Sequence, residues 1–476
     1  MLKQTIGMAA AIGCLLLASC KAPALVQVKE NRDTPARFAG GGSDTTSTAA
    51  TPWRAVFTDP DLVRLIDTAL ARNQELQITL QELTIARNDI RIRQGRLLPF
   101  VTGRVGVGAE KVGRYTSQGA GDAATEIEPG KEMPEVLKDY TGAVYATWEA
   151  DIWKKLRNAK AAAVRRYLAS VEGRNFVQTE LVGEVAEAYY ELLALDNQLA
   201  IIRQNIQLQQ NGLEIVRVQK QAARVTELAV QKFAAEVLHS QSLEWETRQR
   251  IVETENRINF LLARFPQPIP RSRTPLLELA PPPVQAGLPA QLLANRPDIR
   301  RAEQELAAAR LDVQVARAEF FPSLGITAGL GLQAFRPSYL VKFPESVLFS
   351  LAGDLAGPLI NKSAIKAEFS SANARQLQAL YNYERTVLNA YLEVATQLSN
   401  IENLGKSYGY KEQEVAALTT SIDISNTLFT SARADYLEVL MTQRDVLAAK
   451  LELVETKRGQ LAAAINMYRG LGGGWR

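Results

Sequence analysis

Few residues in this sequence could carry out metal chemistry or histidine-dependent catalysis. The chain has one histidine, His239, and two cysteines, Cys14 and Cys20. Zinc sites use clusters of cysteine and histidine, which this composition excludes. A Ser-His-Asp triad needs a histidine, so it would be confined to the surroundings of His239. That residue stands among polar residues in a helical stretch, which is typical of a surface histidine. The composition therefore predicts no metal site.

Acidic residues are the other candidates for chemistry. Glu149 and Asp151 alternate along a segment with strand-like spacing. A carboxylate pair could act as general acid and base, but alternating acidic residues are also expected where one face of a strand borders water. The sequence contains no phosphate-binding glycine loop, so any driving energy must come from a partner. We expect a protein that is not an enzyme.

The N-terminus indicates export. Lys3 precedes an apolar stretch, residues 6–17, which is too short to stay in a bilayer as a spanning helix. The following run, Leu17-Ala18-Ser19-Cys20, resembles the lipobox of bacterial lipoproteins, in which the cysteine is acylated and becomes the first mature residue. An ordinary secretory signal with an incidental cysteine is the alternative. Lys21 in place of Asp resembles the outer-membrane sorting signal of enteric bacteria.

Maturation would leave no free thiol, because Cys14 is removed and Cys20 carries lipid. No disulfide is expected, although the compartment is oxidising. No cofactor is expected beyond the covalent diacylglycerol and N-acyl lipid on Cys20. Lys and Arg number 55 against 51 Asp and Glu, without a basic cluster among aromatics, so no nucleic-acid partner is predicted. Residues 40–50, rich in Gly, Ser and Thr, predict a flexible tether.

A repeat runs through the chain. Residues 72–99 match residues 295–322 at an offset of 223, and both segments are amphipathic helices that end at a proline before an alternating stretch. Residues 224–238 match residues 433–447 at an offset of 209. Two matches in the same order, with the same kinds of element between them, indicate an internal duplication.

The duplication predicts an elongated organisation, although 476 residues alone would suggest about three domains. The expected segments are a signal peptide (1–19), a lipidated N-terminal tether and equatorial segment (20–58), a first structural repeat (59–264, with a β-hairpin at 99–152 and a helical tip near 222–228), a Pro-rich linker (265–290) and a second structural repeat (291–476, with a β-hairpin at 322–360 and a tip near 430–437).

Four stretches of about ten residues alternate apolar and polar side chains, as β-strands do. The apolar positions are Val101, Val105, Val107 and Ala109; Val144, Ala146, Trp148 and Ala150; Leu324, Ile326, Ala328, Leu330 and Leu332; and Val347, Phe349, Leu351 and Leu355. This pattern fits the wall of a membrane barrel, with a soluble sandwich as the alternative. A barrel needs about eight strands, so chains must combine, and three chains would supply twelve.

Apolar residues at alternating steps of three and four indicate long helices. Such stripes run from Leu168 to Ile202, from Leu377 to Ile401 and from Leu437 to Tyr468. This spacing is typical of a coiled-coil seam, and some sixty helical residues would reach roughly 90 Å. The pattern predicts helices too long for a globular core, in either a hollow bundle or a solid coiled coil.

Several motifs resemble those of TolC-type outer-membrane factors, and together they cover nearly the whole mature chain. They are Asn295-Arg296-Pro297-Asp298-Ile299, Ala318-Glu319-Phe320-Phe321-Pro322-Ser323-Leu324, Trp148-Glu149-Ala150-Asp151-Ile152-Trp153, Ala434-Asp435-Tyr436-Leu437-Glu438-Val439-Leu440 with Gln443-Arg444, and Tyr468-Arg469-Gly470-Leu471-Gly472-Gly473-Gly474-Trp475. Lys154, Lys155 and Ala364 depart from the family at positions where it often has glycine, which bears on the bend at the membrane boundary.

The resemblance implies a mostly helical α+β fold. Three chains would form a twelve-stranded β-barrel in the outer membrane, with four strands per chain, continued by a long α-helical barrel in the periplasm with a mixed equatorial domain. The implied partners of this homotrimer are a periplasmic adaptor (membrane fusion protein) and an inner-membrane pump. Lipidated members typically serve pumps of the resistance-nodulation-division type. The implied function is a passive exit duct for drugs, metals or other small toxic compounds.

The two helix reversals are candidates for a periplasmic gate. The candidate residues are Arg224 and Thr226 at the first tip and Arg433, Asp435 and Tyr436 at the second. By resemblance, the second tip forms a constriction ringed by acids, and three copies of Asp435 would repel one another and attract cations. The usual acid of the family falls at the position of Ala434, however, and a plain N-cap role for Asp435 is the alternative.

Two other functions remain open on the sequence. A TolC-like duct could serve type I protein secretion, and a lipid-anchored structural coiled coil of the envelope would need no pore. The amphipathic strands favour a pore, because a tether needs no membrane wall. No Met-rich or His-rich lining indicates the cargo.

Overall fold

A computed structural model of the chain describes residues 23–25, 29–39, 45–272, 274–358, 360, 362–431 and 433–476. Cys20, the predicted site of lipid attachment, lies outside the described residues. The elements in chain order are η1 (Thr48–Ala50), α2 (Trp53–Val56), α3 (Pro60–Arg72), α4 (Gln74–Gly95), β1 (Phe100–Glu110), α5 (Ser117–Ala123), β2 (Glu126–Glu128), β3 (Lys131–Glu132), β4 (Leu137–Ala150), α6 (Lys155–Gln221), α7 (Glu227–Leu261), η2 (Leu276–Glu278), α8 (Ala290–Asn295), α9 (Pro297–Ala318), β5 (Ser323–Ala334), η3 (Pro337–Tyr339), β6 (Val347–Ala356), α10 (Ser363–Thr430) and α11 (Tyr436–Gly470).

The chain divides into two compact units. The strand unit is built around Ile85–Tyr167 and Gln304–Leu380, and the helical unit contains Glu30–Thr84, Leu168–Glu303 and Tyr381–Arg476. Helices α4, α6, α9 and α10 each contribute residues to both units. Among the described residues, no helix combines the length and the apolar character that a membrane crossing requires.

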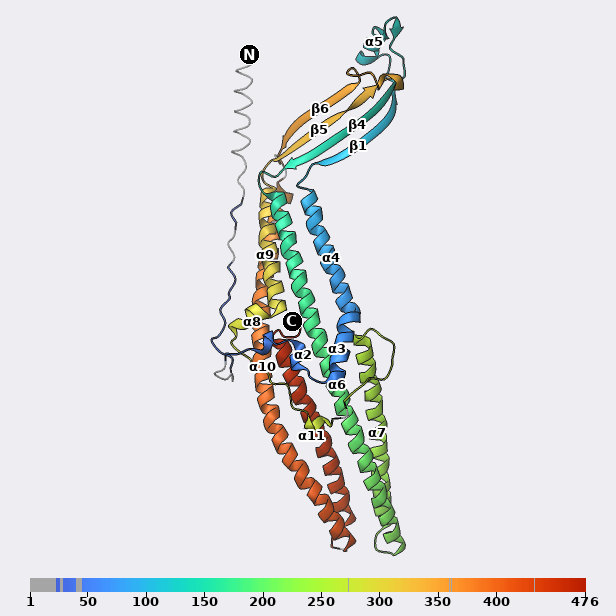
Figure 1. The fold of residues 1–476 in the computed structure, drawn as a ribbon, viewed down its shortest axis with the longest axis vertical. Helices are drawn as coiled ribbons and strands as arrows, with labels where there is room; N and C mark the ends of the chain where they lie inside the picture. The colour runs from blue at the N-terminus through green and yellow to red at the C-terminus, as the bar shows by residue number, and fades with distance from the viewer. Residues whose placement is uncertain are drawn as a thin grey trace. The chain divides into compact units, whose positions relative to one another are not determined.

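One antiparallel sheet forms the centre of the strand unit. The two predicted hairpins join through the pairing of β4 with β5, which gives the order β1-β4-β5-β6 (Figure 1). Residues opposite each other in register share a face, and one such row runs Gly103, Val144, Leu330, Phe349. The four predicted apolar faces therefore coincide in a single surface, which we call the apolar face.

The apolar face is open in the single chain. Val105 is 92 % exposed, Phe349 81 % and Leu351 78 %. Exposed apolar side chains are ordinary when scattered, but a contiguous sheet face of them indicates a surface that another apolar phase covers. The four predicted strands are confirmed, with lengths between 10 and 14 residues.

The opposite face of the sheet is polar and closely packed. One row across it is Thr102, Tyr145, Gly329, Ser350. A Cβ at Gly329 would lie 2.7 Å from Ser350 Oγ and 3.0 Å from the Tyr145 ring, so a larger residue there would have to displace one of these side chains. The four strands follow a curved course, as Figure 1 shows.

The loop between β1 and β4 contains structure that the alternating pattern did not predict. It forms the short helix α5 and the hairpin of β2 with β3. Glu128 accepts a hydrogen bond from the Tyr339 hydroxyl (2.5 Å) and forms an ion pair with Arg336 (2.8 Å). Both partners lie between β5 and β6, so the two loops at this end of the sheet are tied together.

Long helices make up the helical unit. Helices α6 and α10 have 67 and 68 residues, and each pairs with the shorter helix that follows it, α7 and α11 (Figure 1). Leu192 of α6, Ile258 of α7 and Ile465 of α11 belong to one buried cluster. The prediction of helices too long for a globular core is confirmed.

The expectation of a flexible tether over residues 40–50 is wrong for residues 45–50. Ser47 forms an antiparallel bridge with Ala286 of the linker, and Ala49 is fully buried. The small residues that suggest flexibility instead allow close approach of two backbone segments. This part of the N-terminal segment is packed against the helical unit.

Candidate functional site

The motif at the end of β4 builds the start of α6. The Asp151 carboxylate accepts hydrogen bonds from the backbone N–H groups of Leu156 and Arg157 (2.9 Å each) and from Arg157 Nε (3.0 Å). Burial alone would raise the pKa of Asp151, but these hydrogen bonds and the Arg157 charge lower it below its ordinary value. An ionised Asp151 thus satisfies backbone N–H groups in the first turn of α6, which have no partner within the helix.

Two tryptophans of the same motif connect neighbouring strands. Trp148 Nε1 donates a hydrogen bond to the Leu97 carbonyl oxygen (3.0 Å), and Trp153 Nε1 donates to the Pro322 carbonyl oxygen (2.8 Å). The Trp153 ring also stacks on Phe321, with 4.6 Å between ring centroids. Because Leu97 and Pro322 lie just before β1 and β5, the motif ties the end of β4 to the beginnings of two other strands.

The acidic pair considered for catalysis has structural partners. Lys155 forms ion pairs with Glu149 (3.5 Å) and Glu319 (3.2 Å). Burial would lower the pKa of Lys155, but the two carboxylates raise it, so this lysine stays charged. Glu149 is therefore bound to Lys155, while Asp151 caps α6. Neither residue is arranged as a general acid or base.

Lys154 lies at the corner between β4 and α6, where the resemblance described above would place glycine. Its φ of 61° lies in the left-handed region, where a residue with a Cβ costs roughly 1–2 kcal/mol. We expect Lys154→Gly to stabilise the protein by roughly 0.5–1 kcal/mol, because relief of the strain exceeds the extra backbone entropy that glycine loses. Thermal unfolding of the purified protein would measure this as a higher melting temperature.

Lys155→Gly is the matched control for that substitution. It should lower the melting temperature, because it removes the two ion pairs and places glycine in the first turn of α6. Equal destabilisation by both substitutions would contradict the assignment of strain to Lys154.

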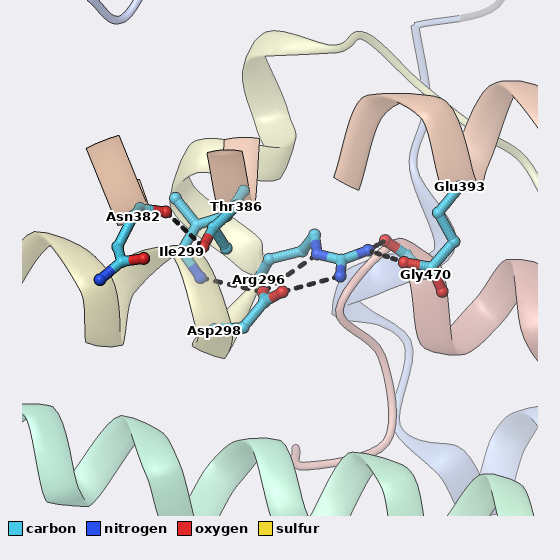
Figure 2. A network of polar contacts seen from close by, with 7 residues as sticks. All are labelled: Arg296, Asp298, Ile299, Asn382, Thr386, Glu393 and Gly470. Carbon is cyan, nitrogen blue, oxygen red and sulfur yellow. Dashed lines mark hydrogen bonds and ion pairs between the residues drawn. The ribbon is translucent and has the colours of Figure 1, made fainter. Parts of the chain in front are cut away.

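A buried guanidinium joins three helices of the helical unit (Figure 2). Arg296, between α8 and α9, is 8 % exposed. Its Nε and Nη2 donate to the two Asp298 oxygens (3.0 and 2.8 Å), and its Nη1 donates to Glu393 of α10 (2.8 Å) and to the Gly470 carbonyl oxygen at the end of α11 (2.6 Å). Burial would lower the pKa of Arg296, but the two carboxylates raise it. The cation is also favourable at a helix C-terminus.

Asn73 is the counterpart of Arg296 in the first repeat, at the offset of 223. Its Nδ2 donates to the Leu261 carbonyl oxygen (3.0 Å) at the end of α7. Leu261 in turn matches Gly470 at the offset of 209. We call these two contacts the helix-end clamps. The internal repeat places Asn73 and Arg296 at equivalent positions. The sequence did not reveal their shared role, because the amide of one and the guanidinium of the other are chemically different groups.

The two tips share a backbone hydrogen bond at equivalent positions. Arg224 N–H donates to the Gln219 carbonyl oxygen (2.9 Å), and Arg433 N–H donates to the Leu428 carbonyl oxygen (2.8 Å). These bonds close the C-terminal turns of α6 and α10 in the Schellman manner. Both pairs are related by the offset of 209, so the duplication extends to the hydrogen bonds of the turns.

The predicted tip residues divide by burial. Arg224, Thr226, Arg433 and Asp435 are exposed, whereas Tyr436 is half-buried against a cluster drawn from α6, α7 and α11. Thr226 and Asp435 occupy the N-cap positions of α7 and α11, but neither side chain makes a capping hydrogen bond. The cluster brings the two tips together, and the gate role of the exposed residues stays a prediction.

The side chains described above form helix caps, turns and contacts between helices, and they are not arranged as a catalytic centre. Within the part of the chain that the structure describes, no group of three or more His, Cys, Asp or Glu side chains could hold a metal ion. The ionisable groups described above stabilise helix ends and corners.

Comparison with known proteins gives a consistent result. The family model described as "Outer membrane efflux protein" matches residues 65–264 and 288–473. The pyoverdine export outer membrane protein OpmQ of Pseudomonas aeruginosa is 29 % identical over 464 residues, which cover 97 % of this chain and 96 % of the relative. The cation efflux system protein CusC of Escherichia coli is 28 % identical over 426 residues, covering 89 % and 88 %.

The fold comparison agrees with the family match. The MtrE outer membrane channel of Neisseria gonorrhoeae, in its open state, superposes with a TM-score of 0.83 at 23 % identity, covering 96 % of this chain and 99 % of that one. The predicted TolC-like, mostly helical α+β fold is thereby confirmed. The family match falls in two segments, as the duplication predicted. The chain belongs to the outer membrane efflux protein family and is a non-enzymatic outer-membrane channel of an efflux system.

Proposed function

We propose that three copies of this chain form a closed duct whose twelve-stranded barrel crosses the outer membrane. The observation that carries the proposal is the apolar face, which spans all four strands and is open in the single chain. Four strands are too few for a closed barrel, and three chains supply twelve. Lipid would cover the apolar face, and the polar face would line the water-filled passage.

Membership of the family supports a proposal for the partners and the cargo. We infer a periplasmic adaptor and an inner-membrane pump of the resistance-nodulation-division type as partners, with the two helix tips as the docking surface and Asp435 at the gate. The relatives named for pyoverdine export and for cation efflux support small compounds as cargo rather than polypeptides. We retain the predicted domain division, with repeats at 59–264 and 291–476, as part of the proposal.

Conductance through a planar lipid bilayer tests the proposed duct. Purified protein should open discrete cation-conducting steps, and their size should be independent of any added nucleotide, because no energy source is built into the chain. The oligomeric state is checked on the same sample by native mass spectrometry. A protein that inserts as a trimer but never conducts would sink the proposal.

Cys20 is proposed to carry the lipid, as a second attachment to the outer membrane beside the barrel. We expect Cys20→Ala, expressed behind an ordinary cleavable signal, still to give trimers and pump-dependent export. Membrane fractionation with an export assay measures both. Loss of the variant protein from the outer membrane would instead make the lipid essential for assembly.

A further inference from the structure

A cavity of about 250 Å³ lies among α6, α7, α10 and α11 of the helical unit, close to the two tips. Phe233, Val439 and Gln443 line it and are buried, while Leu208 at its rim is 44 % exposed. Gly212 lets the Phe233 ring pack close to α6, because a Cβ there would lie 3.2 Å from that ring. We call this space the tip cavity.

An unpaired amide borders the tip cavity. Gln443 is 4 % exposed, and its Oε1 is buried without a hydrogen-bond partner. Buried side-chain amides nearly always find partners, so an unpaired one calls for an explanation. Gln209, three residues before Gly212 on α6, is fully buried, and neither its Oε1 nor its Nε2 has a partner. Two buried glutamines whose side-chain carbonyl oxygens lack a hydrogen-bond partner thus lie beside Gly212 of the wall.

We propose that the tip cavity binds a small amphipathic molecule, with a planar apolar ring system against Phe233 and a hydroxyl group donated to Gln443. A dry cavity of roughly 150 Å³ accepts benzene, so the volume here fits about two fused rings. The same volume is too small for a helix or a strand of a partner protein. Mostly apolar walls with one buried polar group are the usual composition of a small-molecule site.

The position of the tip cavity gives its occupant a mechanical role. Gly212 and Phe233 belong to the pair of α6 with α7, and Phe429 and Val439 belong to the pair of α10 with α11. A ligand that contacts both pairs stabilises the packing in which they enclose it. The binding itself is independent of the proposed duct, because it needs only the helical unit of one chain.

Titration calorimetry of the full chain in lipid nanodiscs tests the site, with 2-naphthol as probe and empty nanodiscs as the blank. We expect saturable binding of one 2-naphthol per chain above the blank. Leu208→Trp should abolish this binding by closing the rim. Val218→Trp is the matched control on α6, since Val218 is 63 % exposed and does not line the tip cavity, and it should bind like the unmodified protein.

The hydrogen bond is tested separately with 2-methylnaphthalene, which has the shape of 2-naphthol without its donor. Gln443→Leu should weaken 2-naphthol roughly fivefold and leave 2-methylnaphthalene unweakened. This comparison of two ligands on one variant does not depend on how Leu208→Trp folds. Heats equal to the blank, binding unchanged by Leu208→Trp, or equal weakening of both ligands by Gln443→Leu would each overturn the proposal.

Discussion

Arg296→Met is expected to lower the free energy of unfolding by about 3 kcal/mol. The substitution leaves Asp298 and Glu393 without their cation and removes the donor to the Gly470 carbonyl oxygen. Removal of one partner from a buried ion pair costs roughly 3–5 kcal/mol, and the low end applies because the Glu393 side chain is 35 % exposed. Chemical denaturation of the purified protein, followed by circular dichroism, measures the loss.

Two further variants separate the clamp from a general loss of charge. Arg64→Met removes an ion pair whose arginine is 74 % exposed, and it should change stability by less than about 1 kcal/mol. Arg296→Met combined with Glu393→Leu should recover part of the loss, because fewer unpaired charges remain. A single Arg296→Met variant as stable as Arg64→Met would contradict the assignment of the clamp.

Leu351→Arg is expected to prevent stable insertion into the outer membrane. Leu351 lies midway along β6 on the apolar face, and a charge at the bilayer centre costs a barrel roughly 2–4 kcal/mol for each chain. In a trimer this cost applies three times, so assembly should fail. The amount of heat-resistant trimer in the outer-membrane fraction measures the effect.

Ala352→Arg is the matched control for that experiment. Ala352 is the next residue of the same strand, at nearly the same depth, and its side chain lies on the polar face opposite Thr327. It should allow assembly and change only the conductance, because its charge faces water. If Ala352→Arg blocked assembly while Leu351→Arg did not, the two faces would have to be exchanged.

The strands and long helices could be predicted because their signals are local and repetitive. Val101 to Ala109 alternate with period two, and the stripe from Leu168 onward keeps steps of three and four, so the chain itself carries the pattern. The hairpin of β2 with β3 lacked such a signal, since two or three residues are too short to show a period. The prediction of a flexible tether was wrong for residues 45–50 for a related reason. These residues are held in place by the linker, which is distant in the sequence.

The functional residues were less predictable than the fold. Asp151 was marked by its motif, but its capping bonds depend on the turn that Lys154 makes in the left-handed region. The partners of Arg296 lie on α10 and α11, far along the chain, and no spacing rule connects them. Asp435 lies at the N-cap position of α11 without making a capping hydrogen bond. Its proposed role at a gate therefore depends on the assembly of several chains and not on contacts within one chain.

The helix-end clamps have a consequence for the symmetry of the assembled ring. In the proposed trimer, the duplication would give a ring like a hexagon with six similar joints, two from each chain. Three of these joints would use the neutral amide of Asn73, and three would use the guanidinium of Arg296 with two carboxylates. Charge-assisted hydrogen bonds are about twice as strong as neutral ones. We therefore expect the Arg296 joints to be stiffer than the Asn73 joints. The ring is therefore expected to deform with threefold rather than sixfold symmetry, and the first movements should occur at the three Asn73 joints.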